Sequence, residues 1–282
     1  MSYLTLSIAN IVQKISIFAA VKNLEHIIEP IRDELAQFEA YFEQSLKADT
    51  EPMGGILRYV QETKGKRLRP ILVLLSAKLF GNINEQTLSA ATFVEMMHSA
   101  TLIHDDVVDA SNLRRGHDSI RAHFGNLSAV LAGDYLLAKA MLLIANNADI
   151  LNVMLSTAAS MSEGELMQNI VADRVSQSGK TTQYLDIITR KTAQLMRSCC
   201  MAGAISVNAS IEQIQQISNF GLNFGILFQL RDDILDDENS VVAKALLPEY
   251  LQKTLNTLKD LPESETLEAL RDLTVFCAER EV

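Results

Sequence analysis

Two short aspartate clusters, each at the end of a long apolar stretch, restrict the fold of this chain more than any other feature. In both, two adjacent aspartates are followed by a third three positions later: Asp105, Asp106 and Asp109, then Asp232, Asp233 and Asp236. On a helix, residues four apart share a face, so the first and last aspartate of each cluster point the same way. The pattern therefore predicts two apolar helices whose acidic ends face each other.

The composition favours helices throughout. The chain has 282 residues but only five prolines and twelve glycines, and its apolar residues recur with helical periodicity. No alternating pattern is long enough to predict a strand, and no internal repeat is visible. We therefore predict one all-α domain over residues 1–282, with helices over 4–18, 31–46, 55–62, 71–80, 85–109, 128–146, 151–172, 181–208 and 211–237.

The charge and the cysteine content exclude several classes of protein. A net charge of −10 argues against nucleic-acid binding, which requires broad basic surfaces. Cys199, Cys200 and Cys277 have no metal-ligand spacing and predict buried thiols in a reducing compartment. Residues 1–20 lack the basic leader of a signal peptide, and no run reaches the length of a membrane span. We therefore expect a cytoplasmic protein without stable membrane insertion.

Clustered carboxylates in an apolar setting need a cation, because their uncompensated burial is unfavourable. Mg²⁺ fits best, since it typically bridges a few carboxylates to substrate phosphates while it keeps its waters. Basic residues supply the complement: Lys66 and Arg69 lie in one loop, and Arg114 and Arg115 follow the first cluster. Solvated helix faces and loops are the alternative explanation, which the repetition of the aspartate pattern weakens. His98, taken alone, is typical of a core histidine.

Several motifs together resemble those of the trans-isoprenyl diphosphate synthases, also called polyprenyl synthetases. The matching segments are 65–70 (GKRLRP), 95–109 (EMMHSATLIHDDVVD), 114–116 (RRG), 133–134 (GD), 164–166 (GEL), 191–192 (KT) and 228–236 (FQLRDDILD). They follow the order of the family between about residue 25 and residue 237. The resemblance implies an isoprenoid-synthase helical bundle around a central apolar cavity, and a homodimer.

The resemblance also implies a role for each matching residue. Mg²⁺ would be bound by the two aspartate clusters, namely Asp105, Asp106, Asp109, Asp232, Asp233 and Asp236. An allylic diphosphate, such as farnesyl or geranylgeranyl diphosphate, would be contacted by Arg114, Lys191, Thr192 and Gln229. Isopentenyl diphosphate would be bound by Lys66, Arg69, His98 and Arg115. With this assignment, a substrate-binding role for His98 is favoured over a purely structural role in the core.

In the implied reaction, cleavage of a carbon–oxygen bond leaves an allylic cation and a departing diphosphate. Mg²⁺ and basic side chains stabilise the developing negative charge. The double bond of isopentenyl diphosphate attacks the cation, a proton passes to the departing diphosphate, and an apolar cavity excludes water.

Product length should depend on the residues one turn below the first aspartate cluster. Ala100 and Thr101 occupy that level and are small, so we expect a deeper floor near Met96, Met97 or Phe93. The expectation is a long-chain, octaprenyl-like product of the quinone side-chain type. Simple helix packing at Ala100 is the alternative explanation.

The chain departs from the family pattern after the second cluster. The family continues there through a lysine-containing loop and several helices, whereas here residues 238–243 lead almost directly into what resembles the last helix pair. Three other functions stay open. They are a short-chain farnesyl or geranylgeranyl diphosphate synthase, a catalytically silent partner subunit, and a terpene cyclase, whose second metal motif usually contains Asn, Ser and Glu.

Overall fold

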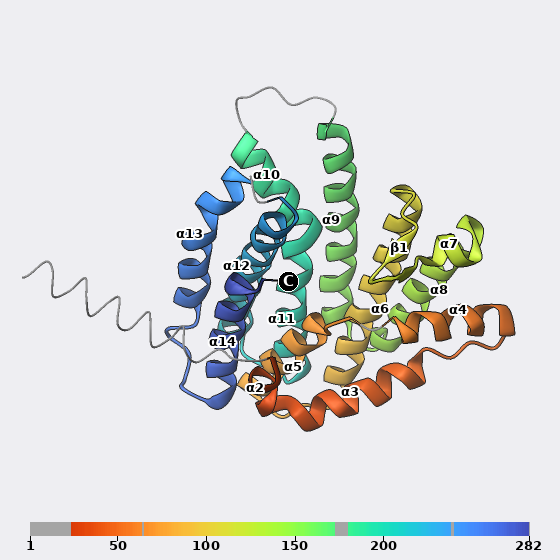
Figure 1. Ribbon diagram of the computed structural model, residues 1–282. Helices are drawn as coiled ribbons and strands as arrows, with labels where there is room; N and C mark the ends of the chain where they lie inside the picture. Colours follow the sequence, from red (N-terminus) through yellow and green to blue (C-terminus); the bar gives the residue numbers. More distant parts are fainter. Residues whose placement is uncertain (1–23, 64, 173–179, 238–239, 282) are drawn as a thin grey trace, which may run out of the picture.

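The computed structural model describes residues 24–63, 65–172, 180–237 and 240–281, and the described chain is a bundle of α-helices (Figure 1). The all-α prediction is therefore confirmed. The helices are α2 (Leu24–Ile27), α3 (Arg32–Ser45), α4 (Glu51–Glu62), α5 (Leu68–Phe80), α6 (Glu85–Val108), α7 (Ile120–Phe124), α8 (Asn126–Ile144), α9 (Ala148–Ala172), α10 (Lys180–Ile188), α11 (Gln194–Ser206), α12 (Ile211–Asp236), α13 (Val241–Thr257) and α14 (Glu265–Glu279).

Four short elements complete the described chain. A 3-10 helix, η1 (Glu29–Ile31), precedes α3, and a π-helix, η2 (Thr189–Ala193), joins α10 to α11. The strands β1 (Leu113–Arg114) and β2 (His117–Asp118) form a hairpin after α6. The predicted helix over 181–208 is therefore interrupted by the π-helical turn. The predicted helix over 4–18 lies outside the described residues.

The long helices pack around a core that extends along α5, α6, α11 and α12. Helix α11 packs against α5, α9 and α12, while α6 packs along α8. Phe93, Phe220, Phe224 and Leu72 are among the fully buried side chains of this core. Helices α13 and α14 flank α12, whereas α3 and α4 cross the lower right of the bundle (Figure 1). Cys199, Cys200 and Cys277 are buried free thiols, as predicted.

Capping residues determine where the two acid-bearing helices begin. The side chains of Asn84 and Thr87 cap each other's backbone at the start of α6, and Ser210 and Gln213 do the same at the start of α12. Helix α6 ends directly before Asp109, and α12 ends at Asp236 itself. Both aspartate clusters therefore lie at the carboxyl ends of long buried helices, as the sequence predicts.

Helix α8 is more apolar than expected from the sequence. Asn126–Ile144 is the one helix of the described chain that has the length and composition of a membrane span, with a mean hydropathy of 1.7. The expectation that no run reaches this length is therefore wrong. A core helix passes the same test, and 33% of this window is buried. Leu127 and Leu142, however, are each 75% exposed.

Glycines allow several helices to approach one another closely. A Cβ atom at Gly203 of α11 would lie 2.2 Å from the carbonyl oxygen of Val73 on α5. At Gly133 of α8, a Cβ atom would lie 2.2 Å from Nε2 of His104 on α6. No side-chain rotation relieves the first contact, because it involves the backbone. Gly203 therefore sets the distance between α5 and α11.

We expect Gly203→Ala to destabilise the fold by about 3 kcal/mol, because α11 must move away from the backbone of α5. Gly55→Ala is the matched control in another helix, since its Cβ atom would meet only Nη2 of Arg58, at 3.8 Å. That change should be neutral or stabilising by up to about 1 kcal/mol. Urea unfolding measures both free energies, and equal effects would contradict the close-approach argument.

Candidate active site

Two neighbouring cavities lie at the acidic ends of α6 and α12. The basic cavity has a volume of about 530 Å³ and is lined by Lys66, Arg67, Arg69, Glu95, His98, Arg115, Phe228, Arg280 and apolar residues of α2 and α14. The acidic cavity has a volume of about 510 Å³ and is lined by Asp105, Asp232, Glu165, Lys191, Thr192, Gln229 and several apolar residues. Arg69, His98 and Phe228 line both cavities and form their shared wall.

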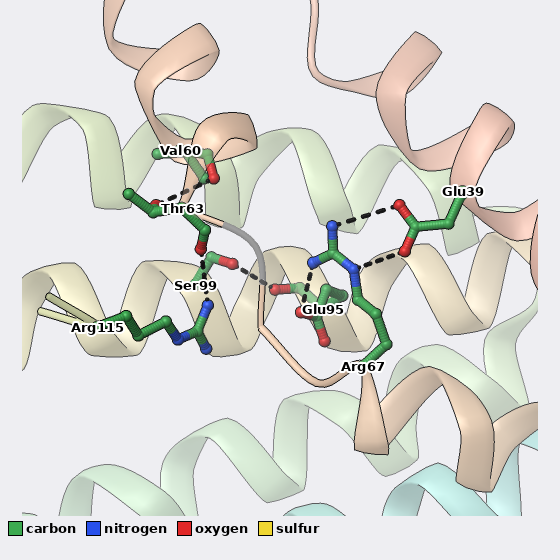
Figure 2. A network of polar contacts seen from close by, with 7 residues as sticks. All are labelled: Glu39, Val60, Thr63, Arg67, Glu95, Ser99 and Arg115. Carbon is green, nitrogen blue, oxygen red and sulfur yellow. Dashed lines mark hydrogen bonds and ion pairs between the residues drawn. The ribbon is translucent and has the colours of Figure 1, made fainter. Parts of the chain in front are cut away.

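The loop before α5 is held in place by Arg67. Its guanidinium donates to Glu39 of α3 at 2.8 Å and to Glu95 of α6 at 2.7 Å, as Figure 2 shows. Glu95 is 3% exposed, so this ion pair also neutralises a buried carboxylate. Arg67 adopts a left-handed conformation with a φ of 56°. Lys66 and Arg69, on either side of it, both line the basic cavity.

Arg115 reaches the basic cavity from the hairpin after α6. Arg115 and Gly116 form its two-residue turn, and both have positive φ, as in a type I′ hairpin. Nη1 of Arg115 donates to the carbonyl of Thr63 at 2.9 Å (Figure 2). A Cβ atom at Gly65 would lie 2.7 Å from Nη2 of Arg115, so glycine makes room for this guanidinium. Strands of two residues each are too short for an alternating sequence pattern, so this hairpin could not be predicted from the sequence.

Arg69 and His98 lie on the shared wall of the two cavities. Burial lowers the pKa of His98 well below its ordinary value, and Arg69, Arg115 and Arg114 lower it further. The imidazole is therefore uncharged at neutral pH and can act on a ligand only as a hydrogen-bond donor or acceptor. Nε of Arg69 is buried and has no hydrogen-bond acceptor within the described part of the chain. The four residues assigned to isopentenyl diphosphate thus line one cavity, and one of them holds an unused donor.

In the acidic cavity, Asp105 and Asp232 come from opposite helices, α6 and α12. Burial raises the pKa of Asp105 to about 6; Glu165 raises it further, while Lys191 acts in the opposite direction. Nζ of Lys191 lies 2.5 Å from Glu165 and donates to Gln168 at 3.2 Å. Burial also raises the pKa of Asp232, which Arg280 opposes. Both carboxylates are therefore better stabilised when a further cation enters the cavity.

The π-helix η2 positions Lys191 and Thr192, and two glycines make room for it. A Cβ atom at Gly164 of α9 would lie 2.7 Å from the backbone nitrogen of Lys191. A Cβ atom at Gly225 of α12 would lie 2.5 Å from Cα of Ala193. The widened turn is therefore packed tightly between α9 and α12. Such single π turns occur frequently at functional sites.

A chain of hydrogen bonds orients the second aspartate cluster. Thr192 Oγ1 donates to Gln229 Oε1 at 2.7 Å, and Gln229 Nε2 donates to Asp233 Oδ1 at 2.8 Å. The hydroxyl of Tyr184 donates to the other oxygen of Asp233. Asp233 is thus held by neutral donors and does not line either cavity. Tyr184 lies outside the matching segments, so the sequence alone does not mark it as a site residue.

The remaining predicted residues lie away from the cavity walls, with one exception. Asp106 is 2% exposed and forms an ion pair with Arg114, whose Nε donates to it at 3.0 Å. Asp109 and Asp236 are exposed. Ala100 and Met97 are buried in the core, whereas Thr101 lines the acidic cavity. The predicted roles of these residues in metal binding, substrate binding and chain length stay predictions.

The donor set fits a cation that substrate phosphates help to hold. No group of three or more His, Cys, Asp or Glu side chains converges within the described ranges. Asp105 and Asp232 nevertheless face one cavity, and Mg²⁺ is commonly bound by one or two carboxylates plus phosphate oxygens. A preformed cage of two aspartate trios is therefore not present among these residues. Two carboxylates with a diphosphate fit the same chemistry.

Arg280, at the carboxyl end of α14, is a site residue that the sequence analysis missed. It forms an ion pair with Asp232, and its Cζ lies 4.2 Å from the centroid of the Phe228 ring. Its Nε is buried without an acceptor in the described chain, like that of Arg69. No motif surrounds Arg280, and it lies 48 residues from Asp232 in the sequence. Only tertiary packing reveals this contact.

Comparison with known proteins defines the class to which this fold and site belong. The family model described as "Polyprenyl synthetase" matches residues 50–244. The octaprenyl diphosphate synthase of Haemophilus influenzae is 35% identical over 195 residues, which cover 68% of this chain and 58% of that protein. The octaprenyl diphosphate synthase of Escherichia coli K12 is 32% identical over 218 residues, which cover 76% of this chain and 66% of that protein.

This chain belongs to the polyprenyl synthetase family. The resemblance and the isoprenoid-synthase fold predicted from the motifs are thereby confirmed. A solved polyprenyl synthase from Caulobacter crescentus, complexed with calcium and isoprenyl diphosphate, superposes with a TM-score of 0.84 at 25% identity and covers 92% of this chain and 98% of its own. The matched stretches span less than two thirds of the two octaprenyl diphosphate synthases.

Asp105→Asn should stabilise the metal-free protein at pH 8. The folded-state pKa is raised from 3.8 to about 6, so ionisation of Asp105 opposes folding above pH 6, and asparagine removes this penalty. After allowance for solvent screening of the partly exposed carboxylate, we expect a gain of about 1 kcal/mol. The gain should shrink as the pH falls below 6 and vanish only below about pH 3.8, because both the folded and the unfolded state then bind the proton.

Melting temperatures in EDTA at pH 8 and pH 4.5 measure this effect. Asp109→Asn changes an exposed carboxylate of the same cluster and should have far less effect at either pH. A gain for Asp105→Asn that is equal at both pH values would contradict the role of ionisation.

Proposed function

We propose that this chain is a Mg²⁺-dependent trans-prenyltransferase that condenses isopentenyl diphosphate with an allylic diphosphate, and that its product is a long-chain polyprenyl diphosphate. The observation that carries the proposal is the shared wall between a basic cavity and a carboxylate-lined cavity. Two diphosphates of different role could thereby be held with their reacting carbons next to each other. The long-chain product is supported by the octaprenyl diphosphate synthases among the relatives.

Each cavity would bind one of the two substrates. Arg69, Arg115 and Lys66 would bind the diphosphate of isopentenyl diphosphate, and neutral His98 would donate a hydrogen bond. Lys191 would stabilise the charge that develops on the leaving diphosphate, while Thr192 and Gln229 orient the second aspartate cluster. Leu102, Met161 and Leu195 line the acidic cavity and would exclude water from the cation.

Mg²⁺ bound by Asp105 and Asp232 would act as a Lewis acid on the leaving diphosphate. The related Caulobacter crescentus polyprenyl synthase was solved in complex with calcium and isoprenyl diphosphate, which supports a divalent cation together with a diphosphate. We also propose a homodimer in the cytoplasm. Exposed apolar residues on α8, namely Leu127, Val130, Leu131 and Leu142, support the dimer, and a monomeric mass in solution would contradict it.

Pyrophosphate release tests the proposed reaction. Purified protein with Mg²⁺, farnesyl diphosphate and isopentenyl diphosphate should release pyrophosphate, and EDTA should abolish the release. Asp105→Asn and Asp232→Asn should each lower the rate by about 100-fold or more, because charge stabilisation in the transition state is lost. Asp149→Asn, an exposed position on α9, should leave the rate unchanged. Folded protein that releases no pyrophosphate would instead favour a catalytically silent partner subunit.

Product length should respond to Thr101, which lines the acidic cavity one turn below Asp105. We expect Thr101→Phe to shorten the main product, because the ring would fill the path of the growing chain. Ala100→Phe should mainly destabilise the fold, since Ala100 is fully buried away from the cavity wall. Mass spectrometry of the products measures the length. An unchanged product distribution in folded Thr101→Phe would contradict the assignment.

A further inference from the structure

Arg280 connects the two cavities. Its side chain lines the basic cavity and is 12% exposed, yet its ion-pair partner, Asp232, lines the acidic cavity. The guanidinium stacks on Phe228, a residue of the shared wall. The carbonyl oxygen of Arg280 accepts a hydrogen bond from Nε of Arg231 at 2.8 Å, which joins this end of α14 to α12. The backbone of Arg280 is thus anchored independently of its side chain.

Two other ion pairs of the described residues each stay within a single cavity. Arg67 and Glu95 both line the basic cavity, and Lys191 and Glu165 both line the acidic cavity. Among the ion pairs of the described residues that line either cavity, Arg280–Asp232 is the pair whose members lie on different walls. A cation that binds Asp232 in the acidic cavity therefore weakens the ion pair of Arg280, which lines the basic cavity.

Arg280 also retains an unused donor. Its Nε is buried and has no acceptor in the described part of the chain. Nε of Arg69, on the wall of the same cavity, is likewise buried without an acceptor there. A buried donor without an acceptor is unfavourable, because it has lost its hydrogen bond to water without gaining another. A diphosphate in the basic cavity would satisfy both donors, since its oxygens accept several hydrogen bonds at once.

We propose that Arg280 binds an anion in the basic cavity, and that its ion pair with Asp232 prevents this binding until Asp232 binds a cation. Without a divalent cation, the guanidinium neutralises the half-buried Asp232 carboxylate. When a cation takes over this carboxylate, the guanidinium is released to the diphosphate in the basic cavity. This inference rests on the proposed function, which assigns isopentenyl diphosphate to the basic cavity.

The exchange couples the two sites thermodynamically. A cation on Asp232 removes the competitor for Arg280 and so tightens diphosphate binding in the basic cavity. By reciprocity, a diphosphate that draws Arg280 away must tighten cation binding by the same factor. The chain would then bind isopentenyl diphosphate well only after the acidic cavity has been loaded with its cation.

Calorimetric titration with isopentenyl diphosphate alone tests the coupling, because no turnover occurs without an allylic partner. In the wild-type protein, Kd should fall about tenfold from EDTA to saturating Mg²⁺, within the usual range of such couplings. In Arg280→Gln, binding should be weak and equal under both conditions. In Asp232→Asn, which frees Arg280, binding in EDTA should already approach the wild-type value in Mg²⁺.

Arg271→Gln is the matched control, since Arg271 lies on the same helix but pairs with Glu263 and Glu268 outside the cavities. It should keep the tenfold difference. Chelation of Mg²⁺ by the diphosphate itself acts equally on every variant, so the comparison isolates the protein's contribution. Arg280→Lys preserves the charge without the forked geometry and should show a reduced but measurable difference.

The proposal is overturned if the wild-type protein binds isopentenyl diphosphate equally with and without Mg²⁺, or if Arg280→Gln keeps the wild-type difference. It is also overturned if Asp232→Asn leaves binding in EDTA unchanged. Failure of the proposed function is distinguishable, because it appears in the pyrophosphate-release assay. Turnover without coupling rejects only the role of Arg280, whereas coupling without turnover rejects only the proposed synthase activity.

Discussion

The neutralisation of buried charge around the two cavities is the constraint on which the rest of this structure depends. Carboxylates and guanidinium groups that leave water require partners, since an unpaired buried charge is strongly unfavourable. Here Asp106 is paired with Arg114, Glu95 with Arg67, and Asp232 with Arg280. These pairs join α6, α12, α14 and the loops beside them. The same contacts therefore hold the helices together and neutralise these buried carboxylates.

Small residues determine how closely the helices that carry these charges approach one another. Gly164 and Gly225 admit the π-helical turn that carries Lys191, and Gly65 leaves room for the guanidinium of Arg115. In each case an added methyl group would overlap neighbouring atoms at less than 3 Å. Close packing of this kind transmits small displacements instead of absorbing them. The positions of the Lys191 and Arg115 side chains are therefore determined in part by close packing against these glycines.

The site combines rigid and exchangeable contacts. Asp233 is held by Gln229 and Tyr184, which are neutral and can keep their hydrogen bonds whatever occupies the cavity. Asp105 and Asp232, in contrast, are half-buried carboxylates whose pKa values are raised mainly by burial. Such groups are better stabilised when a cation arrives, so their environment in the free protein favours ligand binding over stability. The proposed reaction of two diphosphates would use both kinds of contact.

Much of this architecture could be predicted from the sequence, because helical periodicity, capping and motif spacing are local properties. The two acid-bearing helices, their ends and the set Lys66, Arg69, His98 and Arg115 were predicted, and the set lines one cavity. The rotation of each helix about its own axis is not local. It decides that Asp105 and Asp232 face the acidic cavity while Asp106 turns to Arg114 and Asp109 to solvent.

The sequence by itself therefore determined the fold class, the family and the kinds of residue in the site. Only the tertiary structure decided which aspartates share a cavity, how the π-helical turn positions Lys191, and that Arg280 contacts Asp232. The physical reason is the range of the interactions. Backbone hydrogen bonds within a helix join residues four apart, whereas an ion pair between α12 and α14 depends on the packing of every helix between them.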